Sequence, residues 1–349
     1  MPAEKQNQPL KVAVAGVGDF GAIHAKIYAA MPDVELVAVV DADAARAAEI
    51  AARHNCEALQ SPEQLAGKVD AASVAVPTSF HLPVARALLE KGIHVMLEKP
   101  IAPSIEESRA IVAMAARNGV ILQIGHLERF NAGVMKLAEL ASAPRFIEVH
   151  RLGAFVERAT DVDVVADLMI HDIDIALSLV PSDLAEVRAA GARVITEHVD
   201  IANARLEFAN GAVANVTASR VSRRRFRRIR VFSQDAYLAL DFTDQRLEHI
   251  APGELNNAPK SSGEKFPPLV ARPVEVAPQL PLNAELAHFA DCVRHRRRPL
   301  VSGEDGLLAV QVAQEVRRNI AESIARGGRA GAPGRIAEAD IFTSWEGAT

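Results

Sequence analysis

The sequence predicts an α/β protein in which a doubly wound parallel sheet is followed by an α+β domain with a large, open, mostly antiparallel sheet. Two observations carry this prediction. Between Lys11 and Ile124, short apolar strands alternate with helices, which is typical of a parallel sheet covered on both faces. From Glu186 onward, consecutive strands are joined by short turns such as Asn210-Gly211, which indicates antiparallel pairing.

Length and composition limit the class of protein. A chain of 349 residues is long enough for two domains with buried cores, and 49% apolar residues with a net charge of -5 is an ordinary globular composition. Such mild acidity does not favour nucleic acid or an anionic membrane as a partner. We expect a cytoplasmic protein, because we find neither a signal peptide nor an apolar run of about 18 residues. Cys56 and Cys292 lack the spacing of a zinc site.

We expect three segments: a first domain at 1–125, a second domain at 126–326 and a tail at 327–349, in which Ile341, Phe342 and Trp345 could anchor the end. The strands expected in the first domain are Val12–Ala15, Leu36–Val40, Ala72–Val76, His94–Leu97 and Ile121–Ile124. Those expected in the second are Phe146–Leu152, Val187–Val194, Ile201–Phe208, Val213–Ser219, Ile229–Ser233 and Tyr237–Phe242. Its expected helices are Phe130–Leu140, Asp167–Val180, Glu285–Arg296 and Glu304–Arg326. Residues 251–282 hold seven prolines and are expected to be an extended excursion outside the core.

A glycine-rich turn follows the first expected strand, in the spacing Gly16-x-Gly18-x-x-Gly21, with Asp19 and Phe20 between the last two glycines. The first glycine permits a tight turn, the second lets backbone approach a pyrophosphate, and the third lets the next helix pack on the strand. Free N–H groups at the start of that helix would bind the diphosphate. This arrangement predicts a dinucleotide site.

The form of the dinucleotide depends on Asp41, which ends the second strand twenty residues after Gly21. A carboxylate there would hydrogen-bond the adenosine ribose and repel a 2′-phosphate, which favours NAD. Arg46 lies one turn into the following helix and could serve NADP, so NADP is the less favoured alternative.

Glu98-Lys99-Pro100 ends the strand that begins at His94. Ligands of doubly wound sheets bind at the carboxyl ends of strands, so Lys99 is a candidate to reach a substrate. A surface lysine before a turn fits the same pattern, and the spacing does not separate the two interpretations.

Asp167-x-x-x-His171-x-x-Asp174 places three polar groups on one face of a helix. A carboxylate one turn before a histidine can hold its tautomer and stabilise its charged form, as a general base requires. A histidine satisfied in the core is the alternative. Metal binding is disfavoured because these side chains are too few for a closed site, and we expect no metal.

Together these motifs, in this order and spacing over residues 10 to 326, resemble the Gfo/Idh/MocA oxidoreductases. The resemblance implies a Rossmann domain joined to a domain with an open sheet, and places Lys99 and His171 beside the oxidised carbon. It implies that His171 is the general base, Asp167 orients it and Lys99 polarises the oxygen, although either Lys99 or His171 could take the proton. It also places Glu98 and the stretch Pro77, Thr78 and His81 beside the cofactor, where a plain helix start fits equally well.

Gly125-His126-Leu-Glu128-Arg129-Phe-Asn131 narrows the resemblance to the subgroup that contains UDP-N-acetylglucosamine 3-dehydrogenases. That implies oxidation at C3 of the sugar, with Arg129, Asn131, Asp174 and His171 near the substrate. Arg129 could instead form a salt bridge at a helix start. A free sugar, inositol or another nucleotide sugar is the alternative substrate. A non-catalytic NAD-binding regulator is the alternative function, and it should have lost the acid/base pair.

The densest charge feature is the arginine run from Arg220 to Arg230. Alternating arginines on a strand are typical of a solvated sheet face or a subunit contact. Binding of a UDP diphosphate is less favoured, and nucleic acid least, since Phe226 is the only aromatic in the run. The family resemblance also implies a homodimer or homotetramer formed through the open sheet.

Overall fold

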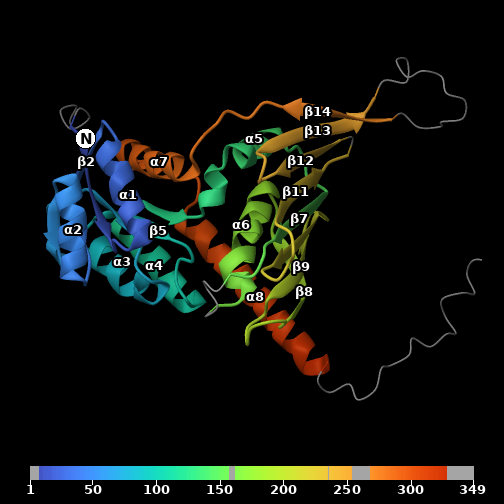
Figure 1. Ribbon diagram of the computed structural model, residues 1–349, viewed down its shortest axis with the longest axis horizontal. Helices are drawn as coiled ribbons and strands as arrows, with labels where there is room; N and C mark the ends of the chain where they lie inside the picture. The colour runs from blue at the N-terminus through green and yellow to red at the C-terminus, as the bar shows by residue number, and fades with distance from the viewer. Residues whose placement is uncertain (1–7, 157–161, 235, 254–267, 328–349) are drawn as a thin grey trace, which may run out of the picture.

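The computed structural model describes residues 8–156, 162–234, 236–253 and 268–327, which form two sheets with helices packed on them (Figure 1). The predicted tail anchors and the middle of the proline-rich stretch lie outside the described residues. Both predicted sheet types are confirmed: one is six-stranded and parallel, the other eight-stranded and mostly antiparallel.

The parallel sheet has the strand order β3-β2-β1-β4-β5-β6. Its strands are β1 Leu10–Ala15, β2 Val34–Val40, β3 Glu57–Leu59, β4 Ala71–Val74, β5 His94–Glu98 and β6 Leu122–Gly125. The strands β1, β4 and β5 are almost wholly apolar and buried, because helices cover both faces. The chain order reverses between β1 and β4, which places a ligand crevice at the carboxyl ends of these strands.

Four helices connect these strands: α1 Asp19–Ala30, α2 Ala44–His54, α3 His81–Leu89 and α4 Ile105–Asn118. At the start of α4 the Ser104 hydroxyl accepts from the backbone N–H of Glu107, and at its end Gly119 adopts a φ of 61°. α1 starts at Asp19, and Gly18 is its N-cap.

The second sheet has the order β14-β13-β12-β11-β7-β10-β9-β8, and only the β7–β10 pair in it is parallel. Its strands are β7 Phe146–Leu152, β8 Leu184–Ala192, β9 Ile201–Phe208, β10 Val213–Ser219, β11 Phe226–Phe232, β12 Tyr237–Asp241, β13 Arg246–Pro252 and β14 Leu269–Val274. β7, β9 and β10 match their predicted ranges residue for residue. Their burial alternates along the strand, as expected for a sheet covered on one face.

The sequence does not predict the edge strand in the second half of residues 251–282, where Leu269–Val274 forms β14 and pairs with β13, although its side chains stay mostly exposed, as expected outside the core. Pro273 lies within β14, and proline is tolerated on an edge strand because one side of the backbone needs no partner. The high proline content of this stretch argues against a strand, so the sequence does not predict β14.

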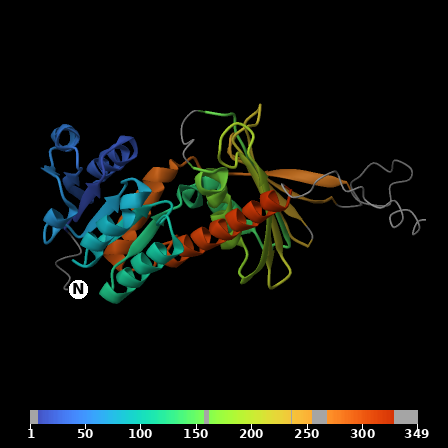
Figure 2. The same cartoon turned by 90° about the horizontal axis from the view of Figure 1, so that it is seen from below.

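Helices cover one face of the second sheet: α5 Ala132–Leu140, α6 Ile170–Leu179 and α8 Gly303–Gly327. Within the described chain, its other face carries no helix (Figures 1 and 2). α7, Pro281–His295, instead packs on the parallel sheet beside α1. α8 starts against β6 and α4 and continues along β8, so a single helix links both sheets (Figure 2). No helix among the described residues combines the length and apolar character needed to cross a bilayer.

Candidate active site

The glycine turn after β1 forms a cradle in which the backbone at Gly18 is open to a ligand. Gly16 has a φ of 82°, and a Cβ on Gly21 would lie 1.8 Å from the Gly16 carbonyl oxygen, so both positions require glycine. A Cβ on Gly18 would meet nothing within 4 Å, which leaves open space above the turn. No side chain caps the start of α1, so its first N–H groups remain available to an anion. These features fit a dinucleotide.

Asp41 and Arg46 lie beside this cradle, as the sequence predicts. The Asp41 carboxylate accepts from the backbone N–H of Val17 at 2.8 Å and of Asp43 at 3.0 Å. Arg46 donates through Nε to the Val17 carbonyl at 2.8 Å and pairs with Glu49. Asp41 therefore helps to hold the glycine turn through its contact with Val17.

The loop after β4 is held against the loop after β5 by His81. Its ring is buried, with Nδ1 3.0 Å from the Pro100 carbonyl and Nε2 3.0 Å from the Val76 carbonyl. Burial lowers the pKa of His81, and the carbonyl contacts oppose that shift. His81 thus braces the two loops that carry Thr78 and Lys99, a structural role that its predicted cofactor contact did not include.

Lys99 extends from the carboxyl end of β5 to the second domain, where its Nζ donates to the backbone carbonyl of Asp167 at 3.1 Å. Burial lowers the pKa of Lys99, while the Asp167 and Glu98 carboxylates oppose that shift. Glu98 lies 3.4 Å from the buried His24 ring, and only a glycine at 125 leaves room for its carboxylate. The motif places one partly desolvated ammonium group at the junction of the domains.

The predicted helix from Asp167 to Val180 begins earlier and with a different geometry. Val165–Met169 forms a π turn, and α6 continues from Ile170. A π turn is wider than an α turn, so residues four apart no longer stack on one face. Within the described chain, no hydrogen bond joins the Asp167 carboxylate to His171, and Nδ1 of His171 is buried without a partner. The predicted orientation of His171 by Asp167 is therefore not present in this structure.

His171 is surrounded by positive charge. Its pKa lies well below the ordinary value because of burial first, then the charges of Lys99, Arg151, His126 and Arg227. The ring packs edge-on against His126, with the centroids 6.3 Å apart. The imidazole is consequently neutral at pH 7, which is the form that accepts a proton.

Besides His171, three residues are predicted to lie near the substrate: Arg129, Asn131 and Asp174. Arg129 lies 3.5 Å from Asp174 and donates to the Leu300 carbonyl at 3.3 Å, so the salt bridge that the sequence allows is formed. Asn131 is 6% exposed and caps α5 by accepting from the N–H groups of Gly133 and Val134. Burial raises the pKa of Asp174. Both Asn131 and Asp174 are buried in this structure.

A cluster of buried ionisable groups surrounds Glu98, the residue before Lys99, and the sequence did not predict it. His24, His126 and Glu285 are almost inaccessible to solvent and have side-chain atoms with no hydrogen-bond partner in the described chain. Glu285 comes from α7, and burial with the Glu98 charge raises its pKa well above the ordinary value. In the sequence, Glu285 occupies a position where the spacing of apolar residues in α7 predicts a buried side chain, and this position could have indicated the cluster.

A second missed group stabilises the helix that carries His171. Arg151 donates to the buried Asp172 at 2.6 and 2.8 Å and to Glu128 at 3.1 Å. Arg227 pairs with the same Glu128. Arg151 takes a core-facing position on β7, between apolar residues, and a charge at such a position was the available signal.

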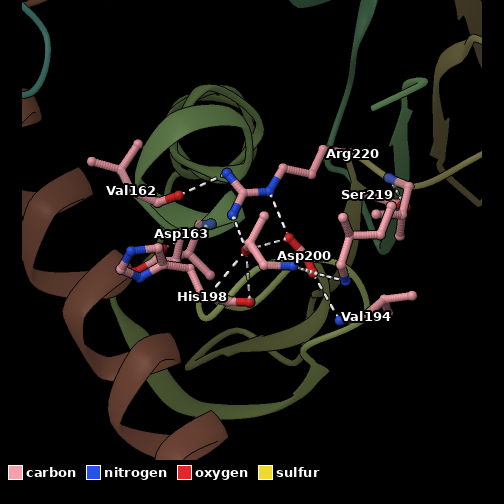
Figure 3. A network of polar contacts seen from close by, with 11 residues as sticks. Val162, Asp163, Val194, His198, Asp200, Ser219 and Arg220 are labelled. Atoms are coloured by element: carbon pink, nitrogen blue, oxygen red, sulfur yellow. Dashed lines mark hydrogen bonds and ion pairs between the residues drawn. The ribbon is translucent and has the colours of Figure 1, made fainter. Parts of the chain in front are cut away.

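The arginine run is only partly the solvated face that the sequence predicts. Arg220 is 6% exposed and donates to Asp200 at 2.9 Å and to the Val162 carbonyl at 2.7 Å (Figure 3). Arg227 is likewise mostly buried against Glu128, whereas Arg223, Arg224 and Arg225 are exposed. The prediction is wrong for Arg220 and Arg227, because carboxylates from distant segments pair with them.

A cavity of about 380 Å³ adjoins Lys99. It is lined from the loops after β4 and β5, from the π turn and from α8, by Thr78, Lys99, Pro100, Ala102, Pro103, Val162, Asp163, Ala166, Asp167, Ile170, His198, Val310, Ala313, Gln314 and Arg317. His171 follows directly after Ile170. The described residues contain no group of three or more His, Cys, Asp or Glu side chains arranged for a metal ion.

Fold and site define an NAD-binding oxidoreductase. Residues 10–126 match the oxidoreductase family with an NAD-binding Rossmann fold, and residues 139–239 match the Gfo/Idh/MocA C-terminal domain. The chain belongs to the Gfo/Idh/MocA family, which confirms the resemblance predicted from the motifs.

Individual relatives are similar over nearly the whole chain. UDP-N-acetylglucosamine 3-dehydrogenase of Acidithiobacillus ferrooxidans is 37% identical over 311 residues, which cover 88% of this chain and 96% of the relative. A solved structure of that enzyme superposes with a TM-score of 0.81 at 36% identity, covering 89% of this chain and 97% of the other. The NAD-dependent scyllo-inositol 2-dehydrogenase of Bacillus subtilis is 28% identical over 337 residues, 87% of this chain and 92% of the relative.

The electrostatics of His171 can be measured directly. We expect its NMR titration midpoint to lie below 6.5, and to rise in Lys99→Met because that variant removes a cation that disfavours the imidazolium form. The His171→Gln spectrum assigns the resonance, and Lys136→Met, which removes a surface lysine paired with Glu139, is the control. A midpoint at or above 6.5, or one indifferent to Lys99→Met, would contradict this account.

Proposed function

We propose that the protein oxidises a sugar hydroxyl to a ketone with NAD, and that the substrate is UDP-N-acetylglucosamine, oxidised at C3. The observation that carries this proposal is the pair formed by a half-desolvated Lys99 and a neutral His171 beside a dinucleotide cradle. The similarity to a UDP-N-acetylglucosamine 3-dehydrogenase supports the particular substrate.

In this proposal His171 takes the hydroxyl proton as the carbonyl forms. Its low pKa keeps it unprotonated before the reaction, and the nearby cations limit how strongly it retains the proton afterwards. Lys99 donates to the substrate oxygen and stabilises the negative charge that develops there. When bound, the nicotinamide supplies the acceptor for the hydride released from the same carbon.

Asp167 has a different role in this proposal from the one expected from its spacing. Its backbone carbonyl holds the Lys99 ammonium, and its carboxylate favours the charged form of that lysine. Asp167 would thus position Lys99, and the closed packing around His171 would orient the imidazole. Arg129, Asn131 and Asp174 would shape the sugar pocket from the domain junction.

The cofactor would lie along the carboxyl edge of β1 and β2. Backbone of Gly16, Gly18, Asp19, Phe20 and Gly21 would hold the pyrophosphate, Asp41 the adenosine ribose, and Pro77, Thr78 and Glu98 the nicotinamide half. Asp41 at the ribose favours NAD over NADP, since a 2′-phosphate there would meet a carboxylate. Cys56 and Cys292 are free thiols, which accords with the proposed cytoplasmic location.

A free sugar or a cyclitol is the alternative substrate class. It is supported by the similarity to the scyllo-inositol 2-dehydrogenase of Bacillus subtilis, because inositol carries no nucleotide. A free sugar or cyclitol would use the same Lys99 and His171. A non-catalytic NAD-binding regulator is disfavoured by the presence of both side chains.

A panel assay decides between these substrates. We expect NADH to form at 340 nm from NAD and UDP-N-acetylglucosamine, with little from free N-acetylglucosamine, other UDP-sugars or inositol. An aminotransferase that consumes the keto product should be included, because the oxidation is reversible. Turnover with inositol alone would transfer the assignment to the alternative class. No turnover with any member, together with intact NAD binding, would favour the regulator.

The role of Lys99 is tested by Lys99→Met, which keeps the length of the side chain and removes its charge. We expect kcat to fall by about 10²- to 10⁴-fold while the Kd for NADH changes little, since the ammonium acts on the substrate oxygen. Lys136→Met is again the matched control. Retention of full turnover would remove Lys99 from the chemistry.

We also propose that the open face of the second sheet is covered by another copy of the chain. Apolar side chains such as Ile201 and Phe226 are exposed on the strands of this sheet. Light scattering at micromolar concentration should give two or four times the chain mass of 37.4 kDa. A mass of one chain would contradict the proposed homodimer or homotetramer.

A further inference from the structure

The cavity beside Lys99 is the inner compartment of a longer groove along α8. A second compartment of about 390 Å³ follows it, and Asp163, His198 and Arg317 line both. The second compartment is otherwise lined by Val165, Arg193, Glu197, Val199, Arg318, Ile320, Ala321 and Ile324. The three shared residues therefore form a bridge between an inner space beside Lys99 and an outer space whose remaining lining residues are mostly apolar.

The length of the groove matches a substrate longer than one sugar ring. α8 contributes Val310 to the inner compartment, Arg317 to the bridge and Ile324 to the outer compartment. Each interval is seven residues, or about 10 Å at the helical rise of roughly 1.5 Å per residue. A sugar at Lys99 would occupy the inner space and leave the outer one to a large substituent.

The bridge is held in place by a network of ion pairs and hydrogen bonds (Figure 3). The Asp200 carboxylate accepts from the backbone of Val194, Ile195 and Thr196 at 2.7 to 3.0 Å, which fixes the turn that presents His198. Arg220 ties the same carboxylate to the Val162 carbonyl, next to Asp163. These contacts fix the backbone beside Asp163 and His198 in the absence of a ligand. Binding would therefore cost the protein little conformational entropy at the bridge.

The charge at the bridge favours an anion. Asp163 uses Oδ1 to accept from the N–H groups of Val165 and Ala166 at 3.0 Å, and Oδ2 to pair with Nε of Arg317 at 2.7 Å. Its carboxylate is therefore already compensated. Among the described contacts Arg317 is engaged through Nε, and Arg317 and His198 line both compartments, so the terminal nitrogens of this guanidinium are the donors that a ligand could use. A guanidinium presents paired donors that suit phosphate oxygens.

We propose that Arg317 and His198 bind the diphosphate of a nucleoside diphosphate sugar, with the sugar at Lys99 and the nucleoside in the outer compartment. This inference rests on the proposed function and assigns its substrate class from the chain's own groove. A free sugar or a cyclitol would leave the terminal nitrogens of Arg317 without a ligand and the outer compartment empty. In this proposal the hydrogen bonds of Arg220 and Asp200 position His198 and the backbone next to Asp163 for the diphosphate.

Binding of UDP alone tests the bridge without any turnover. Calorimetry on the full chain saturated with NADH should detect UDP, and Arg317→Ala should weaken its Kd by about tenfold to a hundredfold, as expected for loss of a charge-assisted contact. Arg317→Lys should lie between the two, because it keeps the charge and loses the paired donors. Arg326→Ala, an exposed arginine on the same helix that lines neither compartment, should bind UDP as the unmodified chain does.

Turnover then separates this inference from the proposed function. We expect Arg317→Ala to raise KM for UDP-N-acetylglucosamine much more than KM for free N-acetylglucosamine, because the free sugar has no diphosphate. Oxidation of UDP-N-acetylglucosamine with no effect of Arg317→Ala on KM or on UDP binding would overturn the bridge and keep the function. Failure of the unmodified chain to bind UDP would also overturn the bridge, and if inositol were then oxidised, the proposed substrate would fall with it. Unfolding measured by thermal melting identifies a misfolded variant, in which case Arg317→Lys decides.

Discussion

The contact between the Lys99 ammonium and the Asp167 backbone carbonyl is the interaction on which the site depends. It joins the carboxyl end of β5 to the π turn, 68 residues further along the chain, across the junction of the two domains. A buried ammonium needs acceptors, and the π turn provides one because its backbone is wider than that of an α-helix. Burial of His171 lowers the pKa of its imidazole, and the Lys99 charge lowers that pKa further.

The charges around His171 are themselves held by buried pairs. Arg151 and Asp172 form a bidentate pair behind the helix, and Glu128 links Arg151 to Arg227. Such pairs contribute little net stability, since desolvation offsets their attraction, but they define where each charge lies. In this protein they place Arg151 and Arg227 near His171, where both charges lower the pKa of the imidazole. The cluster around Glu98 and Glu285 balances them with acidic groups on the side of the parallel sheet.

α8 connects the fold to the site. It starts against β6 and α4, crosses the domain junction beside Lys99 and continues along β8, so the residues that line the groove belong to an element packed on both sheets. A groove built on one long helix keeps a constant distance between its compartments. That rigidity suits a reaction in which donor carbon, base and hydride acceptor must be aligned closely.

The sequence by itself determined the nucleotide cradle and most strands, because these depend on local spacing. Gly16, Gly18 and Gly21 encode a turn that only glycine can form, and alternating burial along β7, β9 and β10 follows directly from residue order. Only the tertiary structure decided the partners of Lys99, His171 and Arg220, since their contacts come from segments far apart in the chain. The π turn broke the helical spacing on which the Asp167–His171 pairing relied, and edge position rather than composition made a strand of β14. Local geometry can be read from neighbouring residues, whereas the placement of buried charges depends on which distant segments the fold brings together.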